Sequence, residues 1–392
     1  MTSPSAEITT FPVGTSTCRT PADAGVGVAG RTARLCLPVT TLRYARHVTD
    51  DAGASGINET VAPEFDLASD EAAEGAAAAA VPVVMVEYAE VSPAPLEPAK
   101  PPAPDPTTKV GRLVANVTDA LMALPTYWQT QTTIEGIEAG DLFGLNGALG
   151  GTIEINVVAT LNRIRKVWDP NDEWPGYGFV RNSQSFPDVR LVGYEAGELV
   201  NAFGIELKGW YLLAKEGEPS FRYKVCPEAC EEHDLLVIVP WHLSNVLAGQ
   251  PTIHEPFIGN ARWLAEMRNH WWLYQRQSTG TRRLKRPQPL PAPYSPPRSK
   301  TSDEGVNDSG RNFGRVSRVN VMNDYLKAML LTQVSGVDAN AWRNFFITNT
   351  KAGRAAVSAA TLEIELASKK VKRETAEEAR DLLSRILDLL RP

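Results

Sequence analysis

Two carboxylates and a lysine that lie close together in this 392-residue chain have the residue types and the spacing of a catalytic group. Asp188 opens one apolar run, and Glu206 and Lys208 lie inside a second. Side chains alternate between the two faces of a strand, so Glu206 and Lys208 share one face while Leu207 takes the other. If the two runs pair as strands, Asp188 approaches the same polar edge and all three side chains converge.

Such a group is suited to chemistry with a divalent cation. Two carboxylates with open coordination positions suit Mg²⁺, which prefers oxygen ligands and keeps several waters and substrate phosphates. The metal lowers the pKa of a bound water and offsets charge on a phosphate during an in-line displacement. The lysine can orient or deprotonate that water and stabilise the developing negative charge. The alternative is a Glu-Lys pair on a solvated edge strand, with the aspartate in a turn.

Pro187-Asp188 and Glu206-Leu207-Lys208 together resemble the motif of the PD-(D/E)xK nuclease superfamily, which includes most type II restriction endonucleases. The resemblance covers roughly residues 110–345. It implies Mg²⁺-dependent hydrolysis of double-stranded DNA by a homodimer, with a DNA methyltransferase as its genetic partner. Asp188 and Glu206 would hold the metal, and Lys208 would serve the attacking water. A repair or recombination nuclease on the same core, and a non-catalytic DNA-binding protein, are the alternatives.

A further acid precedes the motif. Ile153, Val157 and Leu161 form an apolar stripe at helical period, and Glu154 lies beside it. In the resembled superfamily, a helix before the motif strands often supplies another acid to the metal, so Glu154 is the candidate third metal ligand. The alternative is an ordinary glutamate in the first turn of a helix, where the helix dipole favours a negative charge.

The resemblance and the residue patterns together predict a mixed α/β fold, a restriction-endonuclease-like core with a central mixed sheet flanked by helices. The Gly-rich stretch 142–152 is expected to be a connection. One departure from the superfamily is visible, because Cys226–His233 leaves room for little more than a turn where a helix usually stands. The expected elements are a helix at 151–168, strands near 187–193, 203–213 and 234–241, and a helix at 259–276.

Composition indicates a globular chain, since 43% of its residues are hydrophobic and nine are Trp. The N-terminal part differs in composition from the rest. Low-complexity Ala-, Gly- and Pro-rich sequence dominates the N-terminal part, which we expect to be largely disordered, although Val81–Val91 has the character of a strand. The expected domains are a tail and linker at 1–106, the nuclease core at 107–276, a basic Pro-rich loop at 277–318 and a helical region at 319–392.

The net charge of −6 does not exclude a nucleic-acid partner. Residues 1–110 hold 7 Lys and Arg against 14 Asp and Glu, whereas the rest of the chain holds 33 against 32. Local charge matters more than the sum, and ten Lys and Arg lie between Arg276 and Arg318. A basic, Pro-rich loop suits contact with phosphates, and a solvated linker is the alternative. The candidate DNA-binding residues are Arg282, Arg283, Lys285 and Arg286.

The four cysteines form no disulfide framework, which favours a reducing cytoplasm. The longest apolar stretch is too short to span a bilayer. Cys226, Cys230 and His233 have spacing that could contribute to a zinc site, with His242 or His254 completing it. Structural zinc usually has two tight ligand pairs, and only one is visible here. Free thiols in a turn are the alternative.

Overall fold

The computed structural model describes residues 82–135, 145–182, 185–296, 299–309, 312–349 and 372–389. Every described residue belongs to one compact unit, Thr60–Pro392. What we expect of residues 1–81 therefore lies outside the described residues. No helix in the described part of the chain is long and apolar enough to cross a membrane.

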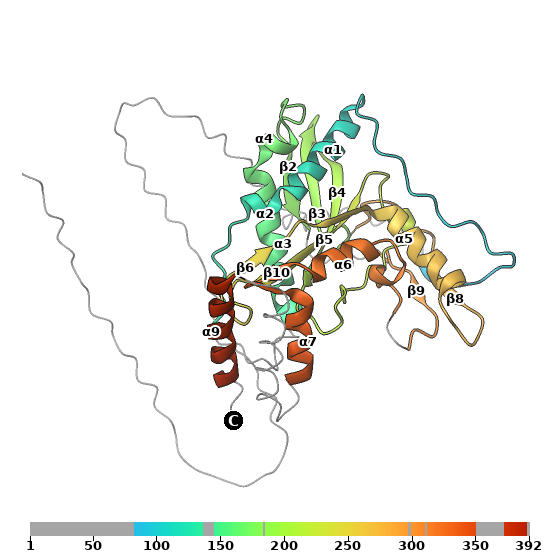
Figure 1. Ribbon diagram of the computed structural model, residues 1–392. Coiled ribbons are helices and arrows are strands. Elements are labelled where there is room, and N and C mark those ends of the chain that lie inside the picture. Colours follow the sequence, from blue (N-terminus) through green and yellow to red (C-terminus); the bar gives the residue numbers. More distant parts are fainter. Residues whose placement is uncertain are drawn as a thin grey trace, which may run out of the picture. The chain divides into compact units, whose positions relative to one another are not determined.

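A curled, mixed sheet of six strands forms the centre of the described unit (Figure 1). Its first three strands form an antiparallel meander, and β5 then runs parallel to β4. β6 and β7 both pair with β5 on its other side, at different ends. The mixed α/β class is therefore as predicted. The strands are β2 (Gly178–Arg181), β3 (Val189–Glu195), β4 (Glu198–Tyr211), β5 (Leu235–Leu243), β6 (Pro251–Ile253) and β7 (Phe257–Asn260).

A tight hairpin joins β3 to β4. Its two loop residues, Ala196 and Gly197, both have positive φ, at 52° and 88°. Such a turn matches the twist of the strands that it connects, so pairing continues up to Glu195 and Glu198. β4 consequently begins at Glu198, earlier than the strand expected from residue 203.

Helices α1 to α4 gather beside β2, β3 and β4 (Figure 1). α3 begins at Leu145, so most of the Gly-rich stretch expected as a connection is helical. Its buried residues Leu149, Ile153 and Val157 join the core, and this packing outweighs the unfavourable helix propensity of glycine. The helices are α1 (Lys109–Met122), α2 (Leu124–Tyr127), α3 (Leu145–Arg163) and α4 (Arg165–Trp168).

Helix α5 (Ala261–His270) matches the helix expected at 259–276. The side chain of Asn260 caps it by accepting a hydrogen bond from Trp263 N at 2.9 Å. A π-helical turn, Trp271–Gln275, continues it, so the helical segment ends one residue before the expected end. It begins two residues later than expected, because Gly259 and Asn260 belong to β7.

A second, small sheet lies beside α5 and has the strand order β1-β8-β9. Its central strand β8 contains Pro287, so part of the segment expected to be a basic Pro-rich loop is a strand. β9 reaches only Leu284 and Lys285, so the missing N–H of Pro287 costs no hydrogen bond on that side. β1 lies in the segment expected to be tail and linker, and pairs with all of β8. The strands are β1 (Val84–Ala89), β8 (Arg283–Gln288) and β9 (Glu304–Gly305).

The described parts of the C-terminal region, 319–349 and 372–389, contain three helices, and residues 350–371 and 390–392 of the expected helical region lie outside the described residues. A hairpin with positive φ at Ser335 and Gly336 separates two helices within residues 320–349. Trp342 and Phe346 are fully buried and stack, which fixes the second helix on the core. The elements are α6 (Asn323–Leu330), β10 (Gln333–Val334), β11 (Val337–Asp338), α7 (Ala339–Asn349) and α9 (Arg373–Leu389).

A buried polar cluster around Asp303 connects α5 to the small sheet. The Asp303 carboxylate is fully buried and accepts hydrogen bonds from Arg268 and Asn269, both at 2.8 Å. It also accepts from Arg286 Nε at 3.2 Å and from the Cys226 thiol at 3.0 Å. Four donors therefore compensate the burial of this charge.

Replacing Asp303 with Ala should lower the free energy of unfolding by about 3–5 kcal/mol, because it leaves the buried Arg268 guanidinium without its carboxylate. Urea denaturation of the full chain measures this loss. The matched control is Asp324→Ala, whose ion pair with Lys327 is exposed and should contribute less than about 1 kcal/mol. Equal effects of the two variants would contradict this assignment.

Candidate active site

The register of β3 on β4 places Asp188 opposite Glu206. Val189, the first residue of β3, pairs with Ile205, so the preceding residue faces the next position along β4. Backbone groups hold both carboxylates: Leu207 N donates to Asp188 Oδ2 at 2.9 Å, and Asp188 N donates to Glu206 Oε2 at 3.3 Å. Each carboxylate is thus positioned by the other strand.

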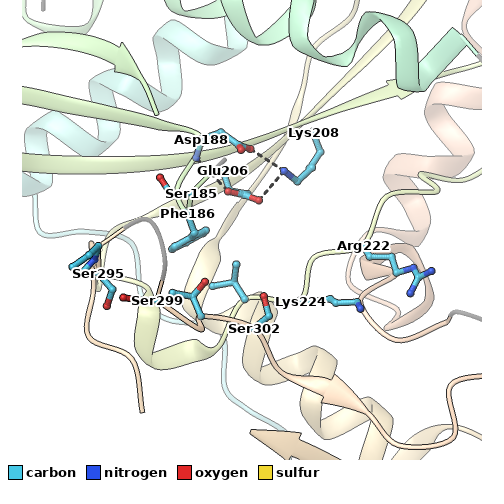
Figure 2. Close-up of a pocket in the computed structure, with 13 residues that line it drawn as sticks. Ser185, Phe186, Asp188, Glu206, Lys208, Arg222, Lys224, Ser295, Ser299 and Ser302 are labelled. Atoms are coloured by element: carbon cyan, nitrogen blue, oxygen red, sulfur yellow. Dashed lines mark hydrogen bonds and ion pairs between the residues drawn. The ribbon is translucent and has the colours of Figure 1, made fainter. Parts of the chain in front are cut away.

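Lys208 completes the group and joins the two carboxylates. Its Nζ lies 2.7 Å from Glu206 Oε1 and 2.8 Å from Asp188 Oδ2 (Figure 2). The side chains of Lys208 and Asp188 are about one-fifth exposed, and that of Glu206 is 9% exposed. The structure therefore brings together the three residues that the sequence singles out, on one side of a partly open site.

Burial changes the protonation chemistry of this group. It raises the pKa of Glu206 to about 7, since the desolvation of the carboxylate and the nearby charge of Asp188 outweigh the attraction of Lys208. For Lys208, burial alone would lower the pKa, but the two carboxylates outweigh it and hold the pKa above its usual range. Lys208 is therefore an ammonium at neutral pH, and Glu206 exchanges its proton near neutrality.

The three side chains line a cavity of about 630 Å³. Arg222 and Lys224 lie across this cavity from the carboxylates, and Ser295, Ser299 and Ser302 lie along its lower side in Figure 2. These groups are donors that suit phosphate and sugar oxygens. The lining residues are Ser185, Phe186, Asp188, Glu206, Lys208, Arg222, Lys224, Val225, Ser295, Pro296, Ser299, Thr301 and Ser302.

The sequence reading does not assign Arg222 and Lys224 to the site. Arg222 and Lys224 are two residues apart in an extended segment and therefore share one face of it. Nothing in the sequence shows which part of the protein that face meets. They belong to the connection between β4 and β5, which are parallel neighbours and need a long crossover. In place of a crossover helix, this connection has extended chain and a single short 3₁₀ turn, Pro227–Ala229, among its described residues. Arg222 and Lys224 lie in the extended part of this connection, which precedes the 3₁₀ turn.

The donor set fits Mg²⁺ bound through few protein ligands. Asp188 and Glu206 offer carboxylate oxygens, and the described residues contain no group of three or more His, Cys, Asp or Glu that could hold a metal. Mg²⁺ is commonly bound by one or two carboxylates together with waters and substrate phosphates. A cation at this position would also stabilise the ionised form of Glu206, which burial disfavours.

Glu154, the candidate third ligand, does not join Asp188 and Glu206. Its carboxylate pairs with Arg181 at 2.9 Å, and it is not among the residues that line the cavity. α3 begins nine residues earlier, at Leu145, so Glu154 is not a first-turn glutamate either. The residue ties the middle of this helix to β2.

The four basic residues expected to contact DNA lie on or next to β8, and none of them lines the cavity. Arg282 pairs with Glu90 at 2.9 Å and Arg283 with Glu87 at 2.7 Å. Arg286 pairs with Glu228 and with the buried Asp303. For Arg282, Arg283, Lys285 and Arg286, contact with DNA stays a prediction, and three of the four already have carboxylate partners.

The cysteines and histidines considered for zinc have other partners. The Cys226 thiol donates to Asp303, and Cys230 lies 3.4 Å from the Tyr223 hydroxyl. Both thiols are fully buried, and burial raises the pKa of Cys230 to about 12. The rings of His242 and His254 pack against each other at 5.1 Å. Among the described residues these groups form no metal-binding cluster, and the free-thiol alternative describes Cys226 and Cys230.

Comparison with protein-family models, with curated proteins and with solved structures finds no match to this chain. The fold is established as mixed α/β with a sheet flanked by helices, and the functional argument rests on the side chains in the cavity.

The pKa of Glu206 predicts how stability changes with pH in metal-free protein. Between about pH 4.5 and pH 7 the folded protein keeps a proton that the unfolded chain has released, so this group lowers stability as pH rises. Glutamine cannot ionise, so Glu206→Gln should gain on the order of 1–3 kcal/mol over wild type between pH 5 and pH 8. The raised pKa of Lys208 changes the pH dependence of stability only near and above the ordinary lysine pKa of 10.5, outside this range.

Urea denaturation in EDTA at several pH values measures this difference. If the stability difference between Glu206→Gln and wild type stays constant from pH 5 to pH 8, the carboxyl does not titrate in this range in the folded protein.

Proposed function

We propose that this protein is a Mg²⁺-dependent endonuclease that hydrolyses phosphodiester bonds of double-stranded DNA. The observation that carries the proposal is the convergence of Asp188, Glu206 and Lys208 in one cavity, with Lys208 Nζ within 2.8 Å of both carboxylates. The residue types and their order along two paired strands are those of the PD-(D/E)xK motif. A solvated surface pair is a poor description, because the carboxylate of Glu206 is almost fully buried.

Each residue has a role that follows from its position. Asp188 and Glu206 would hold the Mg²⁺, which supplies a more acidic bound water and offsets charge on the scissile phosphate. Lys208, kept as an ammonium by the carboxylates, orients the attacking water by hydrogen bonding and stabilises the negative charge that develops on the phosphate. Glu206 would act as an ionised ligand, because the cation would offset the burial that raises its pKa in the metal-free protein.

DNA is the substrate that the cavity and the motif favour together. The cavity is lined by cations and hydroxyls, the groups that contact phosphates and sugars of DNA irrespective of the base sequence. We propose a type II restriction endonuclease that acts as a homodimer in the cytoplasm and is paired genetically with a DNA methyltransferase. A repair or recombination nuclease is the second candidate, since its chemistry would use the same residues.

Near-isosteric changes in the three residues should abolish cleavage and leave the fold intact. With Mg²⁺ and an unmethylated plasmid, Asp188→Asn, Glu206→Gln and Lys208→Gln should each lose at least about 100-fold in rate, as expected when a metal ligand or a charge-stabilising group is removed. Ca²⁺ should support DNA binding with little cleavage, as the resemblance implies. Gel assays of single-turnover cleavage measure the rates.

Lys327→Gln is the matched control, because Lys327 is exposed and paired only on the surface of α6. It should cleave like wild type. If Lys208→Gln were equally active, the lysine would have no part in the mechanism.

The pattern of products separates restriction from repair. A restriction enzyme discriminates its site by base contacts, and each wrong base pair costs roughly 1–3 kcal/mol. A two-fold dimer places two copies of the site on opposite strands of a symmetric sequence. We therefore expect a long unmethylated duplex to be cut into a discrete, reproducible ladder with 5′-phosphate ends. A smear, or a preference for nicks, flaps or single strands, would favour the repair nuclease.

A further inference from the structure

Arg222 and Lys224 differ from the other cations that the described residues place in or near the cavity. Lys208 already lies between two carboxylates. Arg222 reaches only one, Asp308, at 3.9 Å, and that carboxylate also accepts two backbone N–H groups. Within the described part of the chain, Lys224 Nζ has no carboxylate within ion-pair distance. Lys224 is close enough to Glu304 to help lower the pKa of that carboxyl. The wall opposite Asp188 and Glu206 thus carries positive charge that neighbouring carboxylates offset only in part.

The backbone of this wall is fixed from several directions. Tyr223 N donates to Gly314 O, Asp303 N donates to Lys224 O, and both distances are 2.8 Å. Arg268 Nη1 donates to Tyr223 O, also at 2.8 Å. Because the Tyr223 side chain is buried in the core, alternation along this extended segment turns Arg222 and Lys224 toward the cavity.

Gly314 shows how closely this segment is packed. It has a φ of 91°, and a Cβ there would lie 3.0 Å from Arg222 Cβ and 3.2 Å from Lys224 Cγ. Glycine therefore allows both the positive φ and the close approach of this backbone to the Cβ of Arg222 and the Cγ of Lys224. Their positions are set by the fold.

We propose that Arg222 and Lys224 bind the phosphates next to the scissile one on the substrate strand, and thereby position that strand on Asp188 and Glu206. A nucleic-acid strand carries one phosphate per nucleotide, so a strand with one phosphate at the carboxylates brings its neighbours into the same cavity. Thr301 and Ser302, on the same wall, add hydroxyls that suit sugar and phosphate oxygens. This inference rests on the proposed function, and it adds a second point of attachment for the strand.

Salt dependence of DNA binding tests the proposal without requiring catalysis. A fluorescent duplex of arbitrary sequence serves as the probe, because phosphate contacts do not depend on sequence. In EDTA, the double variant Arg222→Gln/Lys224→Gln should bind roughly tenfold more weakly for each charge removed, and the slope of log K against log [KCl] should fall by about two. Fluorescence anisotropy measures both.

Three variants control for folding and for general charge. The charge-conserving pair Arg222→Lys/Lys224→Arg should keep most of the salt slope, and Lys224→Gln alone should lose about one unit of it. Lys327→Gln, on the exposed face of α6, should bind like wild type. If the double glutamine variant loses its cooperative thermal transition, the single variants Arg222→Gln and Lys224→Gln decide the outcome. Singles with the wild-type slope would overturn the proposal.

Cleavage kinetics separate positioning from general damage. With Mg²⁺, the double glutamine variant should show a raised KM and a nearly unchanged kcat, because it loses binding shared by ground state and transition state. A loss confined to kcat would overturn the proposal. Inorganic phosphate, compared with KCl at equal ionic strength, identifies the ligand: specific displacement of the duplex at low phosphate concentration would indicate a site for a single free anion and would overturn strand binding.

Failure of this inference can be told from failure of the proposed function. If wild type binds duplex and Glu206→Gln abolishes cleavage, but the double glutamine variant keeps the full salt slope, only the role of Arg222 and Lys224 is overturned. If wild type neither binds nor cuts duplex DNA, the proposed function fails and this inference fails with it.

Discussion

The Lys208 ammonium can bridge two carboxylates only because β3 and β4 pair in one register. A shift by one residue would turn Glu206 and Lys208 to the opposite face of β4 and separate them from Asp188. The two-residue turn at Ala196-Gly197 and the buried apolar residues of both strands oppose such a shift. The geometry of the candidate site is therefore a consequence of strand pairing. Hydrogen bonds and ion pairs among the three residues then restrict their side-chain conformations.

On the other side of β4, the site depends on a long connection. Because β5 is parallel to β4, the chain must return along the sheet before it pairs again. The buried carboxylate of Asp303 holds this connection indirectly: its own backbone N–H bonds to Lys224 O, and Arg268, which it binds, bonds to Tyr223 O. One buried charge cluster thus supports the wall that faces the carboxylates.

Local pattern predicted much of this arrangement. The sequence placed Asp188, Glu206 and Lys208 on two paired strands, because a period of two and the turn residues between the runs are local signals. It did not single out Arg222 and Lys224, and it named Glu154 as a metal ligand, whereas the Glu154 carboxylate pairs with Arg181 and does not line the cavity. Those outcomes depend on which distant segments meet, as does the pairing of β1 with β8 across nearly two hundred residues. The Gly-rich stretch 142–152 was likewise expected to be a connection because glycine disfavours helices. Tertiary packing of its apolar residues outweighs that propensity, and α3 begins there.

The distribution of charge explains how a chain with a net charge of −6 can suit a polyanion. Basic residues near β8 are numerous, but Arg282, Arg283 and Arg286 form ion pairs within the protein, so their field at a distance is reduced. Arg222 and Lys224 are few, yet they face a hollow lined by hydroxyls. Among the described residues Arg222 has only a 3.9 Å ion pair with Asp308, and Lys224 has no ion pair. Attraction for a phosphate is greatest where cations are unpaired and partly shielded from water. By that criterion, the cavity wall is better suited to hold a DNA strand than the more basic segment around β8.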